Sequence, residues 1–464
     1  FSAPSSGGGE ELTFSGIYGT SGDNYSFNIS AEYYDRNAQS YKENDFASNC
    51  DELYYEGDDG GIYTEFRGIG PNPTPADSCD IFPLSNRVQQ DGFFGSLYYT
   101  PGFSNIGVPG LSESTTSIGN IPFINGTVAA DSNGDGIDDV AIFDGNGDGL
   151  RDFDFQDPFY SLGRTDYVNG ADWVSAVQRI SLFANGDYLL QDDNDTRVFF
   201  EALYANRASD VFNPGGQFFQ WVGADNPYNP CGTDPINGQN CYAGSGLDAF
   251  FGDTRTRMRP IVSIRDDRDT NVVDVYQYRL VGGVDGNIGA FDGFGEGSWT
   301  YEVALNYSAS KGKNSIVGVS EAKLVDSLDN SVRNADGSVT CGAGCVPVNL
   351  FAPNIYQLGG GAFTEAEKDY LFTSREIITE VKQTVISGYV TGDLYKLPWN
   401  DQIVPLVVGA EFRKDEIITD ANDVAAEGLL WGYFSDEGAD GSRDIRELYF
   451  ETEFNIHFIP ISPS

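Results

Sequence analysis

A tandem repeat of acidic and amide side chains is the feature of this sequence best suited to metal chemistry. Residues 131–143 read DSNGDGIDDVAIF and residues 144–156 read DGNGDGLRDFDFQ, so both units follow the pattern D-x-N-x-D-G-x-x-D. Oxygen ligands at the first, third and fifth positions surround one point, and the next glycine permits a sharp turn. Hard oxygen ligands favour Ca²⁺ over softer metals. We therefore predict structural Ca²⁺ bound by Asp131, Asn133, Asp135, the Ile137 carbonyl, Asp139, Asp144, Asn146, Asp148, the Leu150 carbonyl and Asp152.

The repeat departs from an EF-hand, whose twelfth position is a bidentate glutamate. Ile142 and Phe155 occupy that position, and Asp138, Asp154 or Asp157 would have to share the ions between the units. The alternative is a solvated acidic loop without metal. A pattern duplicated in full register favours the metal, because these carboxylates would otherwise repel one another. Ca²⁺ is thus expected to order the segment 131–157 without taking part in catalysis.

No set of residues in the sequence has the pattern of a catalytic centre, and we predict that the protein is not an enzyme. The only histidine, His457, has no nucleophile supplied by a motif. Glu451 and Glu453 could serve as an acid–base pair, but a polar channel wall explains them more simply. The glycines at 359–361 lack the lysine of a phosphate-binding loop.

The six cysteines form three local pairs, each among Gly, Asn, Asp or Pro: Cys50 and Cys79, Cys231 and Cys241, Cys341 and Cys345. An even number in loops is typical of disulfides in an oxidising compartment. Free thiols in a reducing compartment are the alternative. A zinc site is disfavoured because there is one histidine and no paired C-x-x-C spacing.

The charge balance excludes one class of partner. The chain has 27 Lys and Arg against 70 Asp and Glu, a formal net charge of −43. Nucleic-acid binding depends on cationic side chains that neutralise phosphates. We therefore expect no nucleic-acid partner.

Apolar and polar residues alternate in segments of roughly ten residues, which is the period of a β-strand. From 298 to 309 one face reads Trp, Tyr, Val, Leu, Tyr, Ala, and the other carries Glu302 and Asn306. Nine segments show this pattern: 12–19, 25–34, 178–188, 196–206, 272–283, 298–309, 384–395, 404–413 and 447–458. No run of about 18 apolar residues is present, so no transmembrane helix is expected.

Two folds alternate in this way, a soluble β-sandwich and a transmembrane β-barrel. The apolar faces here carry aromatics towards the strand ends, and very short turns alternate with very long connections. Outer-membrane barrels have aromatic girdles, short periplasmic turns and longer extracellular loops, whereas compact soluble domains rarely tolerate such long structureless connections. The pattern favours an all-β, transmembrane antiparallel barrel.

On this interpretation the whole chain, 1–464, is a partial barrel, because nine strands leave an unpaired edge on each side. The expected hairpins are 12–35, 177–208, 272–311 and 377–414, with a last strand at 444–459. The expected extracellular loops are 36–176, which contains the repeat at 131–157, then 209–271, 312–376 and 415–443. The polar faces would line the lumen and the substrate path, with Glu302, Asn306, Glu411, Arg413, Glu451 and Glu453.

Several segments resemble the first half of the barrel in proteobacterial TonB-dependent receptors. They are LTFSGIYGTSGDNYSFNISAEYYDR (12–36), RISLFANGDYLLQDDNDTRVFFEALYANRASD (179–210), NPYNP (226–230), residues 255–268, VGGVDG (281–286), residues 299–307, CVPVNLF (345–351), GAEFRK (409–414) and ELYFE (447–451). The similarity covers most of the chain outside the first long loop, and the order of the segments carries it.

The resemblance implies a 22-strand barrel in the outer membrane of a Gram-negative bacterium, of which strands two to ten are present here. It also implies a plug domain and the TonB–ExbB–ExbD energy-coupling complex, neither of which can be recognised in these residues. The expected function is import of a scarce, bulky nutrient, such as an iron chelate, glycan, peptide or vitamin. A calcium-stabilised adhesion or structural β protein and a passive porin are the alternatives.

Overall fold

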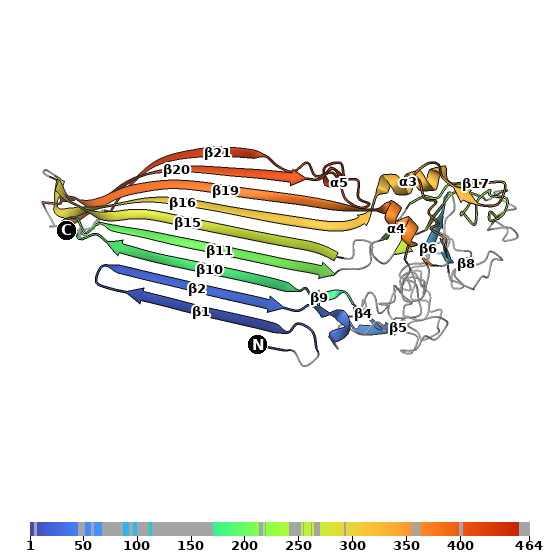
Figure 1. Cartoon of the computed structure of the whole chain (residues 1–464), viewed down its shortest axis with the longest axis horizontal. Coiled ribbons are helices and arrows are strands. Elements are labelled where there is room, and N and C mark those ends of the chain that lie inside the picture. Colours follow the sequence, from blue (N-terminus) through green and yellow to red (C-terminus); the bar gives the residue numbers. More distant parts are fainter. Residues whose placement is uncertain are drawn as a thin grey trace, which may run out of the picture.

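One nine-stranded antiparallel sheet dominates the computed structural model of the chain (Figure 1). Its strands are β1 (Glu11–Ser21), β2 (Tyr25–Arg36), β10 (Val177–Leu189), β11 (Arg197–Phe212), β15 (Thr270–Phe291), β16 (Phe294–Val319), β19 (Phe372–Lys396), β20 (Ile403–Ala421) and β21 (Gly441–Thr452). Each strand pairs with the next of these in the chain. The nine alternating segments all fall on these strands, the last of them as far as the description of β21 extends.

The structure describes residues 1–3, 7–44, 52–56, 60–66, 87–91, 96–99, 111–113, 170–212, 217–218, 220–240, 252–253, 255–260, 262–263, 270–291, 294–352, 354–355, 362–398 and 402–453. His457 and the whole calcium-type repeat lie outside these residues.

The connections differ sharply between the two ends of the sheet. Short turns join β1 to β2, β10 to β11, β15 to β16 and β19 to β20, all at the left of Figure 1. The long connections leave from the right-hand end, where the helices lie. Short turns and long connections therefore lie at opposite ends of the sheet. No helix among the described residues is long and apolar enough to cross a membrane.

Strand register divides the sheet into two chemically different faces, because residues directly opposite in an antiparallel pair point to the same side. Leu305 of β16 lies opposite Gly282 of β15 and Ile386 of β19, and we call their side the apolar face. Asn306 lies opposite Val281 and Val385, and we call that side the polar face.

The longest strands exceed the roughly ten residues expected from the sequence. β15, β16 and β19 have 22, 26 and 25 residues, so sheet structure continues into stretches predicted as loops. In these extensions the apolar face becomes charged, which hides the alternation. Ion pairs occur there instead, such as Lys313 to Glu376 at 2.6 Å and Lys414 to Glu416 at 2.7 Å.

The long connections are not structureless, contrary to the expectation from the sequence. Their described residues include the helices α3 (Glu321–Asn330), α4 (Glu365–Leu371) and α5 (Asp423–Ala426), and the 3₁₀ turn η1 (Tyr41–Glu43). They also contain the short strands β3 (Gln39–Ser40), β4 (Glu52–Glu56), β5 (Ile62–Phe66), β6 (Arg87–Gln90), β7 (Ser96–Tyr99), β8 (Leu111–Glu113), β9 (Asp172–Val174), β12 (Gln217–Phe218), β13 (Met258–Pro260), β14 (Val262–Ser263), β17 (Val332–Arg333) and β18 (Val339–Thr340).

A small hydrophobic core holds parts of these connections together, and we call this packed unit the cap. Its buried members come from segments far apart in the sequence: Val88, Val222, Cys231, Met258, Val319, Leu324, Leu328, Val348, Leu350, Phe351, Ile355, Phe363 and Leu371. Strand β13 also pairs with β6, which joins the first and second long connections in one four-stranded sheet. The cap therefore sits at one end of the large sheet as a folded unit.

Candidate functional site on the polar face

The polar face carries the residues expected to line a substrate path. Glu302 and Asn306 lie on β16, Glu411 and Arg413 on β20, and Glu451 on β21. Register relates them: Asn306 is opposite Val385, which is opposite Arg413. Glu453 lies one residue beyond the end of β21 and is exposed. The five strand residues therefore share one face of the sheet.

Hydrogen bonds between neighbouring strands fix several of these side chains. The Tyr389 hydroxyl donates to Glu302 at 3.3 Å, and Arg279 Nε donates to Asn306 Oδ1 at 3.2 Å. Charge-assisted bonds of this type orient side chains with geometric specificity. The polar face is thus a network of positioned groups along the strands.

Asp415 interacts with three side chains on this face, two of them on the neighbouring strands β19 and β21. It accepts hydrogen bonds from Gln383 at 2.9 Å and Arg443 at 2.7 Å, and Arg413 lies 3.7 Å away. One carboxylate shared by two guanidinium groups leaves net positive charge at this point. The site lies in the part of the sheet towards the cap.

Acidic groups gather on the neighbouring part of β20 and β21. Glu411 lies directly opposite Glu447, and Glu451 follows two pairs further on. Among the described residues none of these three glutamates has an ion-pair partner. Like charges directly opposite are unfavourable in a sheet, so this surface is suited to attract cations or donors of hydrogen bonds.

Two arginines on the polar face were missed by reasoning from the sequence. Arg179 of β10 and Arg207 of β11 lie directly opposite each other. Arg179 falls within the alternating segment 178–188 and Arg207 directly follows the segment 196–206, but only strand register brings them side by side. A register count from the short turn at 190–196 could have paired them.

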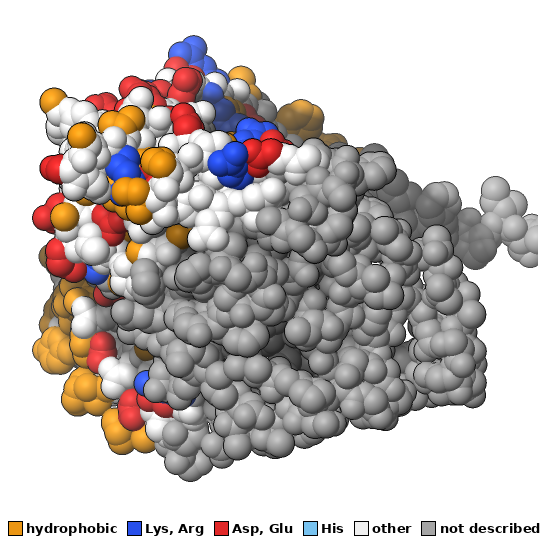
Figure 2. Space-filling view, turned by 90° about the vertical axis from the view of Figure 1, so that its right-hand side faces the viewer, with side chains coloured by type: hydrophobic (Ala, Val, Ile, Leu, Met, Phe, Trp, Pro, Cys, Tyr) orange, Lys and Arg blue, Asp and Glu red, His pale blue; other side chains and the backbone are white. Residues whose placement is uncertain are grey.

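The cap lies at the end of the sheet nearest Arg179, Arg207 and Asp415. Figure 2 looks onto that end, where acidic and basic side chains lie next to one another across the described part and hydrophobic ones gather along the left edge. Within the described residues, no group of three or more His, Cys, Asp or Glu side chains is arranged to hold a metal ion.

Buried asparagines explain the structure of the NPYNP segment in the cap. Asn226 Nδ2 donates to the Leu328 carbonyl at 2.7 Å, near the end of α3. Asn229 Nδ2 donates to the Thr256 carbonyl at 2.9 Å, and its Oδ1 accepts from the Cys231 amide. Both asparagines are buried, so each replaces water as the partner of backbone groups. The segment therefore joins two of the long connections in the cap, the one between β11 and β15 and the one between β16 and β19.

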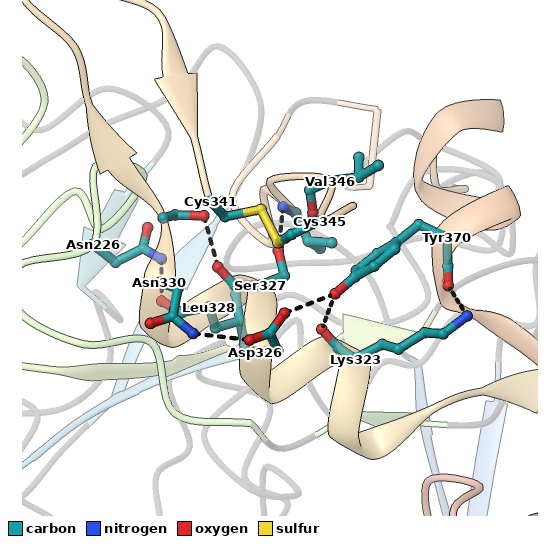
Figure 3. The surroundings of a disulfide bond; sticks show 12 residues. Asn226, Lys323, Asp326, Ser327, Leu328, Asn330, Cys341, Cys345, Val346 and Tyr370 are labelled. Carbon is teal, nitrogen blue, oxygen red and sulfur yellow. Dashed lines mark hydrogen bonds between the residues drawn. A yellow bond between two sulfur atoms is a disulfide. The ribbon is translucent and has the colours of Figure 1, made fainter. Parts of the chain in front are cut away.

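A disulfide links Cys341 to Cys345 beside α3 (Figure 3). In the same region Ser327 donates to the Val346 carbonyl at 2.8 Å and accepts from the Val348 amide at 2.8 Å. Cys231 is also disulfide-bonded. Cys50, Cys79 and Cys241 lie outside the described residues.

A buried ion pair connects β17 to the segment 227–234 of the cap. Arg333 of β17 donates to Asp234 at 2.8 Å and to the Pro227 carbonyl at 3.0 Å. Burial alone would raise the pKa of Asp234. The hydrogen bonds from Arg333 and from the Asn237 and Ile236 amides outweigh it, so the pKa lies below the ordinary value of 3.8.

This pKa shift predicts that acid loosens the cap. A carboxyl group with a lowered folded pKa stabilises the fold above its unfolded pKa, and this contribution is lost as the pH falls through the folded pKa. We expect amide exchange in 220–240 and 332–340 to accelerate only below about pH 4. Hydrogen–deuterium exchange at a series of pH values measures this, and the step should be absent in Asp234→Asn. An identical acid step in that variant would contradict the assignment.

No known protein-family model matches the chain, and no curated protein is significantly similar to it.

Proposed function

We propose that the nine-stranded sheet is part of an outer-membrane β-barrel that imports a bulky nutrient. The observation that carries this proposal is the exposed apolar face. Large hydrophobic side chains on it are exposed on every strand: Phe14, Ile29, Leu182, Tyr204, Leu280, Leu305, Ile386, Val408 and Leu448. Soluble proteins rarely expose apolar patches of more than a few hundred Å², whereas a barrel presents such a face to lipid.

The limits of the apolar face fit the thickness of a membrane. On β2 it runs from Tyr25 to Tyr33, eight residue steps, which is about 27 Å along the strand and roughly 20 Å in height at the tilt of barrel strands. The hydrophobic band of an outer-membrane barrel is about 25 Å tall and bordered by aromatic girdles. Aromatics lie near both limits here, Tyr25, Tyr188 and Tyr301 towards the short turns and Tyr33, Tyr204, Tyr276 and Tyr278 towards the cap.

Charged side chains begin on the same face directly beyond the aromatics. Lys311 of β16 lies opposite Tyr276 and Glu380, and Lys382 lies beside Glu380 at 3.1 Å. Charges are costly within the lipid-facing band and cheap at its edges. This change of chemistry supports a membrane boundary at that level, with the cap on the extracellular side.

Exposure supports curvature of the sheet towards its polar face. In the central strands the apolar Leu280, Leu305 and Val408 are exposed, whereas Glu302 and Arg413 on the other face are half-buried. Crowding of one face is expected when that face is concave. In the proposal the polar face lines the lumen. Strands β1 and β21 pair on one side only within the described residues, and in the proposal each continues to a further strand.

The proposed importer is of the TonB-dependent kind, in the outer membrane of a Gram-negative bacterium, and the segments quoted above support this assignment. Its partners would be outer-membrane lipid, the TonB–ExbB–ExbD complex and the imported nutrient. The structured cap and the polar face favour a receptor with a selective entrance over an open pore. No catalytic role is proposed.

Detergent extraction and energised uptake together test the proposal. We expect the protein to fractionate with outer membranes and to require detergent for solubility. We expect uptake of its nutrient in whole cells to stop on addition of a protonophore. Solubility without detergent would indicate the surface adhesion protein, and uptake unaffected by the protonophore would indicate the passive porin.

Ca²⁺ in the repeat at 131–157 is part of the same proposal, and its removal gives a separate prediction. Chelation should expose this segment to protease and lower the thermal stability of the protein, since repulsion among carboxylates is then uncompensated. Limited proteolysis with and without a chelator measures the effect, with Mg²⁺ re-addition as the control. Unchanged cleavage of 131–157 after chelation would contradict the metal site.

A further inference from the structure

We propose that Arg179 and Arg207 form a binding subsite for an oxyanion group of the imported substrate. The inference deepens the proposed function, because it takes the polar face as the substrate path. The two residues are directly opposite on β10 and β11. Their Cα atoms are therefore about 4.5–5.5 Å apart and both side chains point to the polar face.

The charge environment makes this pair unusual. Two like charges directly opposite destabilise a sheet, and the chain has more than enough carboxylates to neutralise every arginine. Neither Arg179 nor Arg207 forms an ion pair with a carboxylate in the described part of the chain. Both are exposed on the polar face.

Several other arginines of the polar face have carboxylate partners, whereas Arg36 of β2 donates to the Ser175 carbonyl. Arg197 contacts Asp285 at 2.7 Å, Arg279 lies 3.6 Å from Glu201, and Arg443 contacts Asp415 at 2.7 Å. Most of these arginines thus lie next to a carboxylate of the chain. Arg179 and Arg207 face each other without one, which points to a negative charge supplied from outside the chain.

Neighbouring residues hold the guanidinium group of Arg179, and the next pair on one side of the two arginines has small side chains. Arg179 lies over the ring of Tyr34, 4.3 Å from its centroid, and the Tyr34 hydroxyl is itself fixed by donating to Glu11 at 2.8 Å. On the side away from the cap, the next pair on this face is Ser181 opposite Ala205. Both of these side chains are small, and Glu32 of β2 lies opposite Ser181 on its other side.

Guanidinium groups bind carboxylate, phosphate or sulfate through two parallel N–H···O bonds, and this geometry suits planar or tetrahedral oxyanions. An oxyanion between the two arginines would relieve their repulsion and use donors that have no carboxylate partner. The pair lies towards the cap end of β10 and β11, where a substrate from outside would first reach the polar face. The subsite therefore selects substrates that carry an acidic group.

Calorimetric titration of the full-length protein in detergent micelles tests this. The probes are inorganic phosphate, succinate and succinamide, the last a neutral analogue of nearly the same shape. We expect phosphate and succinate to bind and succinamide not to bind. Arg179→Gln and Arg207→Gln should each weaken succinate binding about tenfold to a hundredfold, the usual loss for a charge-assisted hydrogen bond.

The matched control is Arg197→Gln, which removes the same charge from the same face of β11 but from an existing ion pair. It should leave succinate binding unchanged. Thermal unfolding without added anion adds a second readout: Arg207→Gln should raise Tm by removing repulsion, and Arg197→Gln should not. A purely structural role of Arg207 predicts the opposite sign for its variant.

Equal binding of succinamide and succinate would overturn the proposal, and so would an equal loss of affinity in Arg197→Gln. Failure of the importer function is a separate result. Succinate binding that depends on Arg179 and Arg207 in a protein without energised uptake would keep the subsite and reject the transporter. Energised uptake without such binding would reject the subsite alone.

Discussion

Arginine in place of Leu305 is expected to destabilise the protein in a phospholipid bilayer by about 2–4 kcal/mol, the cost of such a charge at the middle of the lipid-facing band. Leu305 is half-exposed at 49% and lies on the apolar face between Val303 and Tyr307. If that face contacts lipid, the guanidinium loses its hydration with no partner in the hydrocarbon. Reversible unfolding from lipid vesicles in a denaturant series measures the difference in free energy.

The matched control is Ala304→Arg, one residue earlier on the same strand. Ala304 points to the polar face, where it lies opposite Gly283 and Ser387. An arginine there keeps access to water and to nearby acids, so a change within about 1 kcal/mol is expected. Equal costs at the two positions would exclude a membrane on one side of the sheet. A larger cost at Ala304 would reverse the assignment of the faces.

The sequence contained enough information for the strands of the large sheet and for their order. Short-range alternation reveals them because one face must be apolar and the other polar over several consecutive pairs. It fails where the environment changes along a strand. Lys311, Lys313 and Lys382 interrupt the apolar face of β16 and β19, yet backbone pairing continues past them to Val319 and Phe372. Alternation reflects whether each face of a strand meets an apolar or a polar environment. The ends of a strand depend instead on how far the backbone hydrogen bonds continue.

The cap was missed for a different reason. Its helices are short, and its core is assembled from segments separated by hundreds of residues, so no local pattern contains it. Local signals for the helices did exist. Thr364 and Glu367 form a capping box at the start of α4, and Leu324 and Leu328 of α3 have the i, i+4 spacing of a buried helical face. No local signal shows which segments of the chain these helices pack against.

The candidate site also has a part that local sequence patterns predict and a part that they do not. Assignment of Glu302, Asn306, Glu411, Arg413 and Glu451 to one face needed only alternation within each strand. The pairing of Arg179 with Arg207 needed register between strands, which depends on the length of a turn. The residue types on a face can thus be predicted from each strand by itself. The neighbours of a residue on adjacent strands cannot be predicted in this way, because they depend on register.

Truncation of Leu324 to alanine should unfold the cap locally while the large sheet keeps its structure. Leu324 is fully buried at 0% exposure in the core that joins α3 to the other connections. Leucine-to-alanine changes at such positions cost about 2–5 kcal/mol, through lost burial and the cavity left behind. Amide exchange in 321–330 and 346–355 should accelerate roughly thirtyfold or more, as expected from a stability loss of that size.

The control is Val332→Ala in β17, a change within the same cap at a side chain that is 56% exposed. Exposed positions of this kind usually change stability by no more than about 0.5 kcal/mol. Protection of β16 and β19 below the cap should be unaffected in both variants, because the ladder of backbone hydrogen bonds there does not depend on Leu324. Loss of protection in those strands would mean that cap and sheet unfold together. Unchanged exchange in α3 would mean that the connections are held by backbone pairing and disulfides instead of by their core. The expected result makes the cap a cooperative unit that can open without disturbing the sheet, as a selective entrance above the polar face requires.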